Sequence, residues 1–269
     1  MAFLVSSNGC SVGWGGLGGT LPTDTLPDGQ SIQAIVKSLQ SSGVQVILSF
    51  GGAVGSEPAL TCTSASQLQA VYQSVINRYN VTMLDFDIEG GAVSDQASLT
   101  RRDQALKGLK AANPSLVISY TLPVLPTGLI PSGVNVLTSA KADGLPLNVV
   151  NIMAMDYGSA IDNGGKMGQD ATQAAAATES QIQSAGLSST TIGITPMIGV
   201  NDTNTEVFQL ADAQTVLNFA EANSYVTRLS MWSLARDNGG CPAQSWASPT
   251  CSGVAQAIYG FSAVFVQVK

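Results

Sequence analysis

Histidine is missing from this sequence, and that absence excludes a wide range of chemistry. Catalytic triads built on histidine, imidazole proton shuttles and the usual zinc sites all require an imidazole side chain. We therefore expect no such metal site, and we expect carboxylates to carry any acid and base catalysis.

Charge is also scarce, and its balance is acidic. Charged residues make up 11% of the 269 residues, and 11 Lys and Arg against 18 Asp and Glu give a formal net charge of −7. The sequence pI is near 4.4. Because an anionic chain is repelled by nucleic acid and by anionic membrane surfaces, we expect neither as a partner and favour a neutral substrate.

Long apolar runs are absent as well. No stretch approaches the length needed to span a bilayer, and Met1 is not followed by a charged region and a cleavable apolar segment. We expect the chain as given to be soluble. Its 45% hydrophobic content is ample for a large core, and its length suits a single α/β barrel.

Cysteine is present at four positions, without the short paired spacings of a zinc ribbon or a thioredoxin-like centre. An even number suggests disulfides. A bridge between Cys241 and Cys251 would close a short loop rich in Pro, Ser and Ala, which leaves Cys10 to pair with Cys62. The alternative is four reduced, buried thiols.

Two N-glycosylation sequons begin at Asn80 and Asn201. Together with the low lysine content and the expected disulfides, they favour a secreted protein.

Residues 83–89 alternate between apolar and acidic side chains. In a strand, successive side chains point to opposite faces, so Asp85, Asp87 and Glu89 would share one face. Crowded carboxylates have perturbed proton affinities and concentrate at active sites, and we expect Asp85 and Asp87 to share a proton. The alternative is an ordinary strand with a solvated acidic face. The apolar face would hold Leu84, Phe86 and Ile88.

Short β-rich runs alternate with longer segments of helical periodicity along the whole chain. This rhythm predicts repeated βαβ units, a parallel sheet and one domain over residues 1–269. The expected strands are residues 2–6, 44–50, 83–89, 116–122, 149–155, 192–198 and 229–234. The expected helices are residues 31–42, 65–79, 95–112, 170–185 and 211–222. Glycine-rich stretches at 13–19, 51–55 and 158–165 would follow strand ends, where a barrel places its chemistry.

Four motifs at expected strand ends resemble, in this order, those of family 18 glycoside hydrolases. They are Ser49-Phe50-Gly51-Gly52, Asp85-Phe86-Asp87-Ile88-Glu89-Gly90, Met153-Ala154-Met155-Asp156-Tyr157 and Ser230-Met231-Trp232-Ser233. Further runs are similar to one branch of bacterial and fungal chitinases. These are Tyr120-Thr121-Leu122-Pro123, Met167-Gly168-Gln169 and Thr195-Pro196-Met197-Ile198-Gly199.

The resemblance implies a TIM-type (β/α)8 barrel that cleaves β-1,4 bonds between N-acetylglucosamine units in chitin or its oligosaccharides, with retention and without a cofactor. It makes Glu89 the general acid, Asp87 the residue that orients the substrate acetamido group, and Asp85 the support of Asp87. The acetamido oxygen itself would be the nucleophile.

The resemblance also implies a set of substrate-binding residues. Trp232 would form the floor under a sugar ring, with a core tryptophan as the alternative. Trp14 is a candidate second platform, although structural packing is favoured for this residue. The remaining candidates are Asp156, Tyr157, Met153, Tyr120 and Gln169.

The chain departs from the commoner family pattern in three places. Thr82 stands where an aspartate is usual, and Met155 stands where a tyrosine is usual, so that Tyr157 or Tyr120 would have to supply that hydroxyl. Counted by its motifs, the acidic strand is the fourth of the barrel, and the first strand and helix are missing, as in a truncated gene product. Residues 262–269 alternate and could supply a replacement strand, although the family would place a helix there.

The resemblance leaves other functions open. A lectin-like carbohydrate-binding protein and an endo-β-N-acetylglucosaminidase share the same scaffold. We expect a monomer of reduced stability, with a risk of association through the open edges of the barrel.

Overall fold

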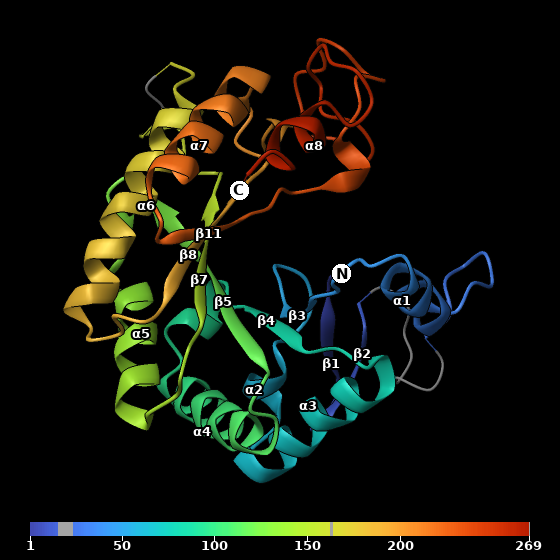
Figure 1. Cartoon of the computed structure of the whole chain (residues 1–269), viewed down its shortest axis with the longest axis vertical. Coiled ribbons are helices and arrows are strands. Elements are labelled where there is room, and N and C mark those ends of the chain that lie inside the picture. Colours follow the sequence, from blue (N-terminus) through green and yellow to red (C-terminus); the bar gives the residue numbers. More distant parts are fainter. Residues whose placement is uncertain (16–23, 162–163, 269) are drawn as a thin grey trace. The chain divides into compact units, whose positions relative to one another are not determined.

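A parallel sheet forms the centre of the first of the two compact units into which the chain divides (Figure 1). The structure is a computed structural model and describes residues 1–15, 24–161 and 164–268. The first unit comprises Met1–Thr121 and Ser132–Val149, and the second Leu122–Pro131 and Val150–Lys269. A single catalytic domain over residues 1–269 stays a prediction.

The sheet of the first unit has the neighbour order β1-β3-β4-β5, and these four strands run parallel. They are β1 (Leu4–Asn8), β3 (Leu48–Gly51), β4 (Met83–Asp87) and β5 (Val117–Leu125). Between them lie α1 (Ile32–Ser41), α2 (Pro58–Thr61), α3 (Ala65–Tyr79), the 3-10 turn η2 (Gly90–Val93) and α4 (Gln96–Ala112), and α5 (Pro131–Asp143) follows β5. This alternation confirms the predicted α/β class.

The apolar face of β4 forms the core of the first unit. The Phe86 ring is fully buried, stacks on Phe50 at 5.2 Å and meets Tyr72 of α3 edge-on at 5.0 Å. The parallel register pairs Phe86 with Phe50 on β3 and with Tyr120 on β5, so all three side chains share the face that α3 packs against. The alternation predicted for residues 83–89 is the one observed.

A hairpin stands where the sequence suggested a glycine-rich loop. β2 (Ser11–Trp14) pairs antiparallel with β1, and Trp14 at its end is 7% exposed. Its indole N–H donates to the Tyr79 hydroxyl at 2.7 Å. The prediction that Trp14 is a sugar platform is therefore wrong, because its ring is committed to the core. Residues 16–19 of the predicted glycine-rich stretch lie outside the described residues.

Both predicted disulfides are present. Cys10 in the turn of the hairpin is bonded to Cys62 after α2, and Cys241 is bonded to Cys251. The alternative of free thiols is excluded, because no cysteine is left unpaired.

The second unit contains three further strands of the sheet, in the order β11-β8-β7. These are β7 (Val149–Ala154), β8 (Thr191–Pro196) and β11 (Val226–Leu229), with α6 (Met167–Ser184) and α7 (Leu210–Ala222) between them. Short elements complete it: β6 (Gly128–Leu129), β9 (Gly199–Val200), β10 (Val207–Phe208), the 3-10 turn η3 (Leu234–Arg236) and α8 (Gly260–Phe265). β11 ends before the predicted range, yet Trp232 still bridges in parallel to Met197.

The C-terminal residues form a helix, so the predicted replacement strand is wrong. Phe261 and Phe265, one turn apart, are both buried, which is helical rather than alternating spacing. Asp237 fixes the start of α8, because its carboxylate accepts the amide protons of Phe261 and Ser262 at 3.0 and 2.8 Å.

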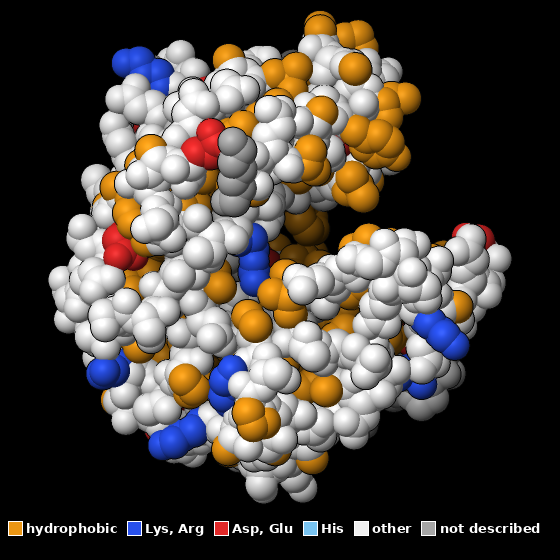
Figure 2. All heavy atoms as spheres, viewed as in Figure 1, with side chains coloured by type: hydrophobic (Ala, Val, Ile, Leu, Met, Phe, Trp, Pro, Cys, Tyr) orange, Lys and Arg blue, Asp and Glu red, His pale blue; other side chains and the backbone are white. Residues whose placement is uncertain are grey.

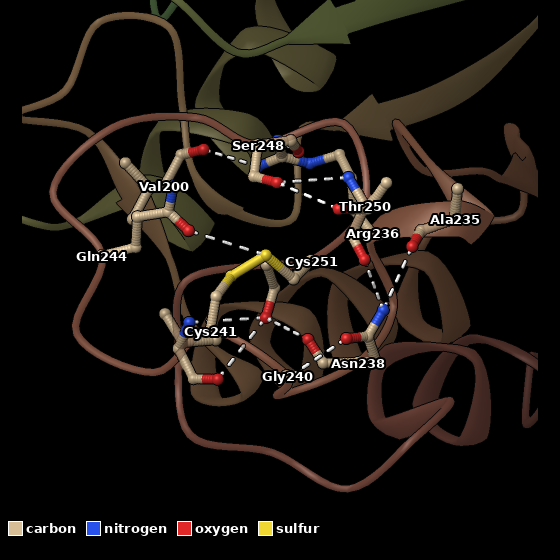
Figure 3. Close-up of a disulfide and its surroundings, with 12 residues drawn as sticks. Val200, Ala235, Arg236, Asn238, Gly240, Cys241, Gln244, Ser248, Thr250 and Cys251 are labelled. Carbon is tan, nitrogen blue, oxygen red and sulfur yellow. Dashed lines mark hydrogen bonds between the residues drawn. A yellow bond between two sulfur atoms is a disulfide. The ribbon is translucent and has the colours of Figure 1, made fainter.

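The long loop before α8 is held by polar contacts around the second disulfide (Figure 3). The Arg236 guanidinium is buried and donates to the carbonyls of Ile198, Val200 and Ser248. Asn238 donates to the carbonyl of Thr250 at 2.8 Å. These side-chain contacts add to backbone hydrogen bonds of the loop, such as the one from the Ala243 amide to the Gly253 carbonyl at 3.0 Å.

The two sequons differ in accessibility. Asn80 is exposed at the end of α3, whereas the side chain of Asn201 is fully buried and donates to the carbonyls of Met197 and Gly199. In the folded protein only the first of the two displays its asparagine on the surface.

The visible surface carries few charges, as the composition requires (Figure 2). Exposed apolar side chains are concentrated in the C-terminal segment, where Leu234, Trp246, Ile258, Tyr259 and Val266 are each more than half exposed. Among the described helices, none has the length and apolar character to cross a membrane.

Replacing Phe86 by alanine tests the core of the first unit. We expect Phe86→Ala to lower the free energy of unfolding by about 3–5 kcal/mol, because it leaves a cavity among Phe50, Tyr72 and Tyr120. Val54→Ala, at an 84% exposed position, is the control and should change it by less than about 0.5 kcal/mol. Chemical denaturation gives both values, and equal effects would contradict the packing described.

Candidate active site

The acidic face of β4 opens into a cavity of about 210 Å³. Asp85 and Asp87 are 7% and 5% exposed, and Glu89 is half-buried directly after the strand. Asp87 and Glu89 both line the cavity. The three carboxylates therefore run from the interior of the sheet to the wall of a hollow, which excludes the alternative of a solvated acidic face.

Asp85 is held by three hydroxyl groups from its own strand's neighbours. Ser49 Oγ on β3 donates to Oδ2 at 2.7 Å, and Ser119 Oγ on β5 donates to Oδ1 at 2.6 Å. Thr121 Oγ1 lies 2.9 and 3.0 Å from the two oxygens. The parallel register places Ser49 and Ser119 directly opposite Asp85 and places Thr121 opposite Asp87, so two rows on one face of the sheet build this cradle.

Asp87, unlike Asp85, is not fully hydrogen-bonded. One of its oxygens, Oδ1, is buried without a hydrogen-bond partner among the described residues. Burial raises the pKa of Asp87 to about 9, and the charges of Glu89 and Asp85 add to the effect. Its carboxyl is therefore protonated at neutral pH.

Glu89 is hydrogen-bonded to Asp87, and desolvation raises its pKa as well. The proton belongs to this pair, whose titrations are coupled. The prediction that Asp85 and Asp87 share a proton is thus modified: Asp87 shares it with Glu89, while Asp85 accepts hydrogen bonds from hydroxyl groups.

Glycines let the end of β3 approach this pair. Gly51 has φ +97°, and a Cβ there would lie 2.1 Å from the carbonyl oxygen of Asp87. The next amide, of Gly52, donates to that same oxygen at 3.1 Å. Since any larger residue would collide with the backbone that carries Asp87, the Ser-Phe-Gly-Gly motif is explained by backbone contact.

Tyr120 lies on the other face of the sheet, so its predicted role in substrate binding is wrong. Its hydroxyl donates to Asp103 Oδ1 at 2.5 Å, and its side chain is fully buried. Burial raises the pKa of Asp103 to about 6, while the hydrogen bonds from Ser139 and Tyr120 oppose that rise. Because Ser119 and Thr121 share the acidic face, the residue between them must point away from it.

A buried ion pair beside the cavity escaped the sequence analysis. Glu57 lines the cavity with its stem and is 4% exposed, but its carboxylate accepts from Arg102 at 2.8 Å and from the Ala59 amide at 2.9 Å. Arg102 is fully buried on α4. No local pattern links residues 45 positions apart, so the sequence offered no means of finding this pair.

In the second unit, the residues that follow β7 form a hydrogen-bonded turn. Asp156 is exposed with φ +50°, and its Oδ1 accepts the Thr203 amide at 2.7 Å. Partial burial raises the pKa of Asp156, and that hydrogen bond lowers it. Tyr157 is 7% exposed, and its buried hydroxyl has no hydrogen-bond partner among the described residues. Burial raises the pKa of that hydroxyl further from neutrality.

Trp232 is 41% exposed, which excludes the alternative of a core tryptophan. Met153 is half-buried near the end of β7. Gln169 is exposed in the first turn of α6. The residue of this turn that contacts α7 is Gly168, whose amide donates to Asp212 at 2.8 Å. The Met167-Gly168-Gln169 run is thus explained by helix packing, and a role of Gln169 in substrate binding stays a prediction.

Within the ranges that the structure covers, no group of three or more His, Cys, Asp or Glu side chains could hold a metal ion. The site on the first unit consists of carboxylates and hydroxyls.

Residues 15–226 match the sequence profile described as glycosyl hydrolases family 18. The chain is 37% identical over 286 residues to the probable bifunctional chitinase/lysozyme of Escherichia coli (strain K12), an alignment that covers 98% of this chain and 31% of that protein. It is 40% identical over 218 residues to endochitinase 11 of Metarhizium anisopliae, covering 75% of this chain and 42% of that one. It therefore spans less than half the length of either curated relative.

Solved structures of chitinases are similar to this chain as well. The catalytic domain of the hyperthermophilic chitinase from Pyrococcus furiosus is 30% identical with a TM-score of 0.83, and the match covers 99% of this chain and 84% of that one. Catalytic-site mutants of active domain 2 of the thermostable chitinase from the same organism, complexed with chito-oligosaccharides, are 28% identical with a TM-score of 0.81 and the same coverage.

Replacing Asp87 by asparagine tests the proton on the buried pair. The folded pKa of Asp87, about 9, lies above the unfolded value near 4, so between these values the folded protein binds more protons and loses stability as pH rises. We expect wild type to lose stability relative to Asp87→Asn from pH 5 to 8, by up to about 1.4 kcal/mol per pH unit.

Thermal unfolding of both proteins across that range measures the difference. Asp28→Asn, at an exposed site, is the control and should differ from wild type by a constant amount. A constant difference for Asp87→Asn too would show that Asp87 is ionised.

Proposed function

The chain belongs to glycosyl hydrolase family 18, and from this we propose that it hydrolyses β-1,4 linkages between N-acetylglucosamine units in chitin or chitooligosaccharides, with retention of configuration. The observation that carries this proposal is the hydrogen-bonded pair of Asp87 and Glu89 beside the cavity, with Asp85 held behind it by hydroxyl groups.

The first step needs an acid and a nucleophile on opposite sides of the scissile bond. The Glu89 carboxyl, whose pKa is raised, gives its proton to the glycosidic oxygen as the bond to C1 breaks. The acetamido oxygen of the same sugar attacks C1 and forms an oxazolinium ion, so the protein supplies no covalent nucleophile.

Asp87 orients that nucleophile. When it turns from Glu89 to the acetamido N–H, it leaves the shared proton on Glu89, so that the Asp87 carboxylate fixes the oxygen against C1 and its negative charge stabilises the oxazolinium. Asp85 keeps its three hydroxyl donors throughout and supplies a fixed negative charge behind Asp87. Glu89, now a carboxylate, then takes a proton from the water that opens the ring of the intermediate, which restores the starting configuration.

The candidate sugar-binding side chains belong to the second unit. The half-exposed indole of Trp232 offers a flat apolar surface to a pyranose ring. The hydroxyl of Tyr157, which has no hydrogen-bond partner among the described residues, replaces the hydroxyl of the tyrosine that is usual at Met155, and Asp156 precedes it in the chain. Met153 lines the same strand end.

We also propose an extracellular location and a monomeric state. Two disulfides in a chain of this size are typical of oxidising compartments, and one displayed sequon at Asn80 agrees with secretion.

Glu89→Gln tests the acid. We expect it to lower kcat on a chromogenic chitotrioside by about 10²–10⁴-fold, because the amide cannot donate a proton, and to leave the binding of chitotetraose intact. Glu221→Gln on the exposed face of α7 is the matched control and should keep full activity. Proton NMR of the first product should show the β-anomer.

Other experimental outcomes would indicate a different function. Binding without turnover by the correctly folded wild type would indicate the lectin-like alternative, and cleavage confined to the core of N-glycans would indicate an endo-β-N-acetylglucosaminidase. Undiminished turnover by Glu89→Gln would remove Glu89 from the acid role.

A further inference from the structure

Glu206 is a buried carboxylate that binds backbone amides. It is 1% exposed, and it follows the short loop between β9 and β10. Its Oε2 accepts the amide proton of Tyr157 at 3.1 Å, and its Oε1 accepts that of Gly158 at 2.8 Å. One side chain therefore fastens two consecutive residues that are 49 and 48 positions away in the sequence.

The same turn is fastened at Asp156 as well. The Asp156 carboxylate accepts the Thr203 amide, and the Asp156 amide donates to Asn201 Oδ1 at 3.4 Å. Asn201 is anchored in turn by two bonds from its Nδ2 to backbone carbonyls. Three successive residues after β7 are thus attached to the loop 201–206 by side chains.

The conformation of the turn makes these acceptors necessary. Asp156 and Gly158 have φ +50° and +93°, in the left-handed region, so this backbone leaves the strand direction. Its amides point to Glu206, and a buried amide left without an acceptor costs about 1–3 kcal/mol.

We propose that Glu206 is a positioning residue: by holding the amides of Tyr157 and Gly158 it sets the place of the Tyr157 hydroxyl for the substrate. This inference rests on the proposed function. None of the described residues makes a hydrogen bond to this hydroxyl, so the backbone of Tyr157 and the packing of its ring decide where it lies. A displacement of the order of 1 Å is enough to lower turnover about 10²-fold.

A double-mutant cycle on kcat/KM separates positioning from mere support of the fold. Glu206→Gln can accept only one of the two amides, and its NH2 group would face the other. Tyr157→Phe removes only a hydroxyl that makes no hydrogen bond to the described part of the chain. We expect each single variant to lose about 10- to 100-fold in kcat/KM, and the double variant to lose no more than the larger single loss, because both act through the same hydroxyl.

Asp237→Asn is the matched control, since Asp237 is also 1% exposed in the second unit and also accepts two consecutive backbone amides. It should lower the unfolding temperature as Glu206→Gln does and leave kcat/KM of the folded enzyme unchanged. Glu206→Asp keeps the charge with a shorter reach, and we expect partial recovery of turnover.

Multiplicative losses in the double variant, or an equal loss of turnover in Asp237→Asn, would overturn the positioning role. If Glu206→Gln does not fold, Glu206→Asp takes its place in the cycle, and failure of both to fold would show that Glu206 serves folding alone. Absence of wild-type turnover overturns the proposed function instead, and the same cycle measured on the Kd for chitotetraose then tests Glu206 separately. Absence of both turnover and binding overturns both.

Discussion

The alignment of β3, β4 and β5 is the constraint on which the first unit depends. A parallel register pairs Ser49, Asp85 and Ser119 in one row and Phe50, Phe86 and Tyr120 in the next, and the pleat sends successive rows to opposite faces. One face is the core and the other is the acidic site. A slip of one residue would bury the acids against α3 and turn the rings into the site, so the packing of Phe86 and the hydroxyl cradle of Asp85 enforce the same register.

Burial and mutual repulsion explain the behaviour of the acids. The ion pairs that join Arg78 to Asp24 and Arg102 to Glu57 do not include the carboxylates of the acidic face of β4. Three neighbouring carboxylates reduce their repulsion by retaining a proton, and the buried pair of Asp87 and Glu89 retains it. A chain without histidine thereby obtains a group that is protonated at neutral pH.

The sequence was sufficient for features that depend on local periodicity. The acidic strand, the order of parallel strands and both disulfides follow from alternation, spacing and cysteine number, and the structure agrees with all of them. The face on which Tyr120 lies could also have been predicted, because successive side chains of a strand point to opposite faces. The hairpin that buries Trp14 and the helix α8 were not predicted, because an antiparallel hairpin and a helix start are fixed by distant partners, Tyr79 and Asp237. Glu57 and Glu206 were missed for the same reason, since each meets partners more than 40 residues away.

The hydrogen-bond partners of the buried carboxylates distinguish those that stabilise the fold from those that are available for catalysis. Glu57 is neutralised by Arg102, and Asp237 by the amides at the start of α8, so their charges are satisfied within the protein. Asp85 is hydrogen-bonded to hydroxyl groups, which bear no charge. Its negative charge is therefore not cancelled and acts on Asp87. Asp87 retains an oxygen with no partner in the described chain, and its other contact is to a carboxyl at the wall of a cavity. Burying such a group destabilises the free protein, so the interaction that satisfies it must come from a molecule in the cavity.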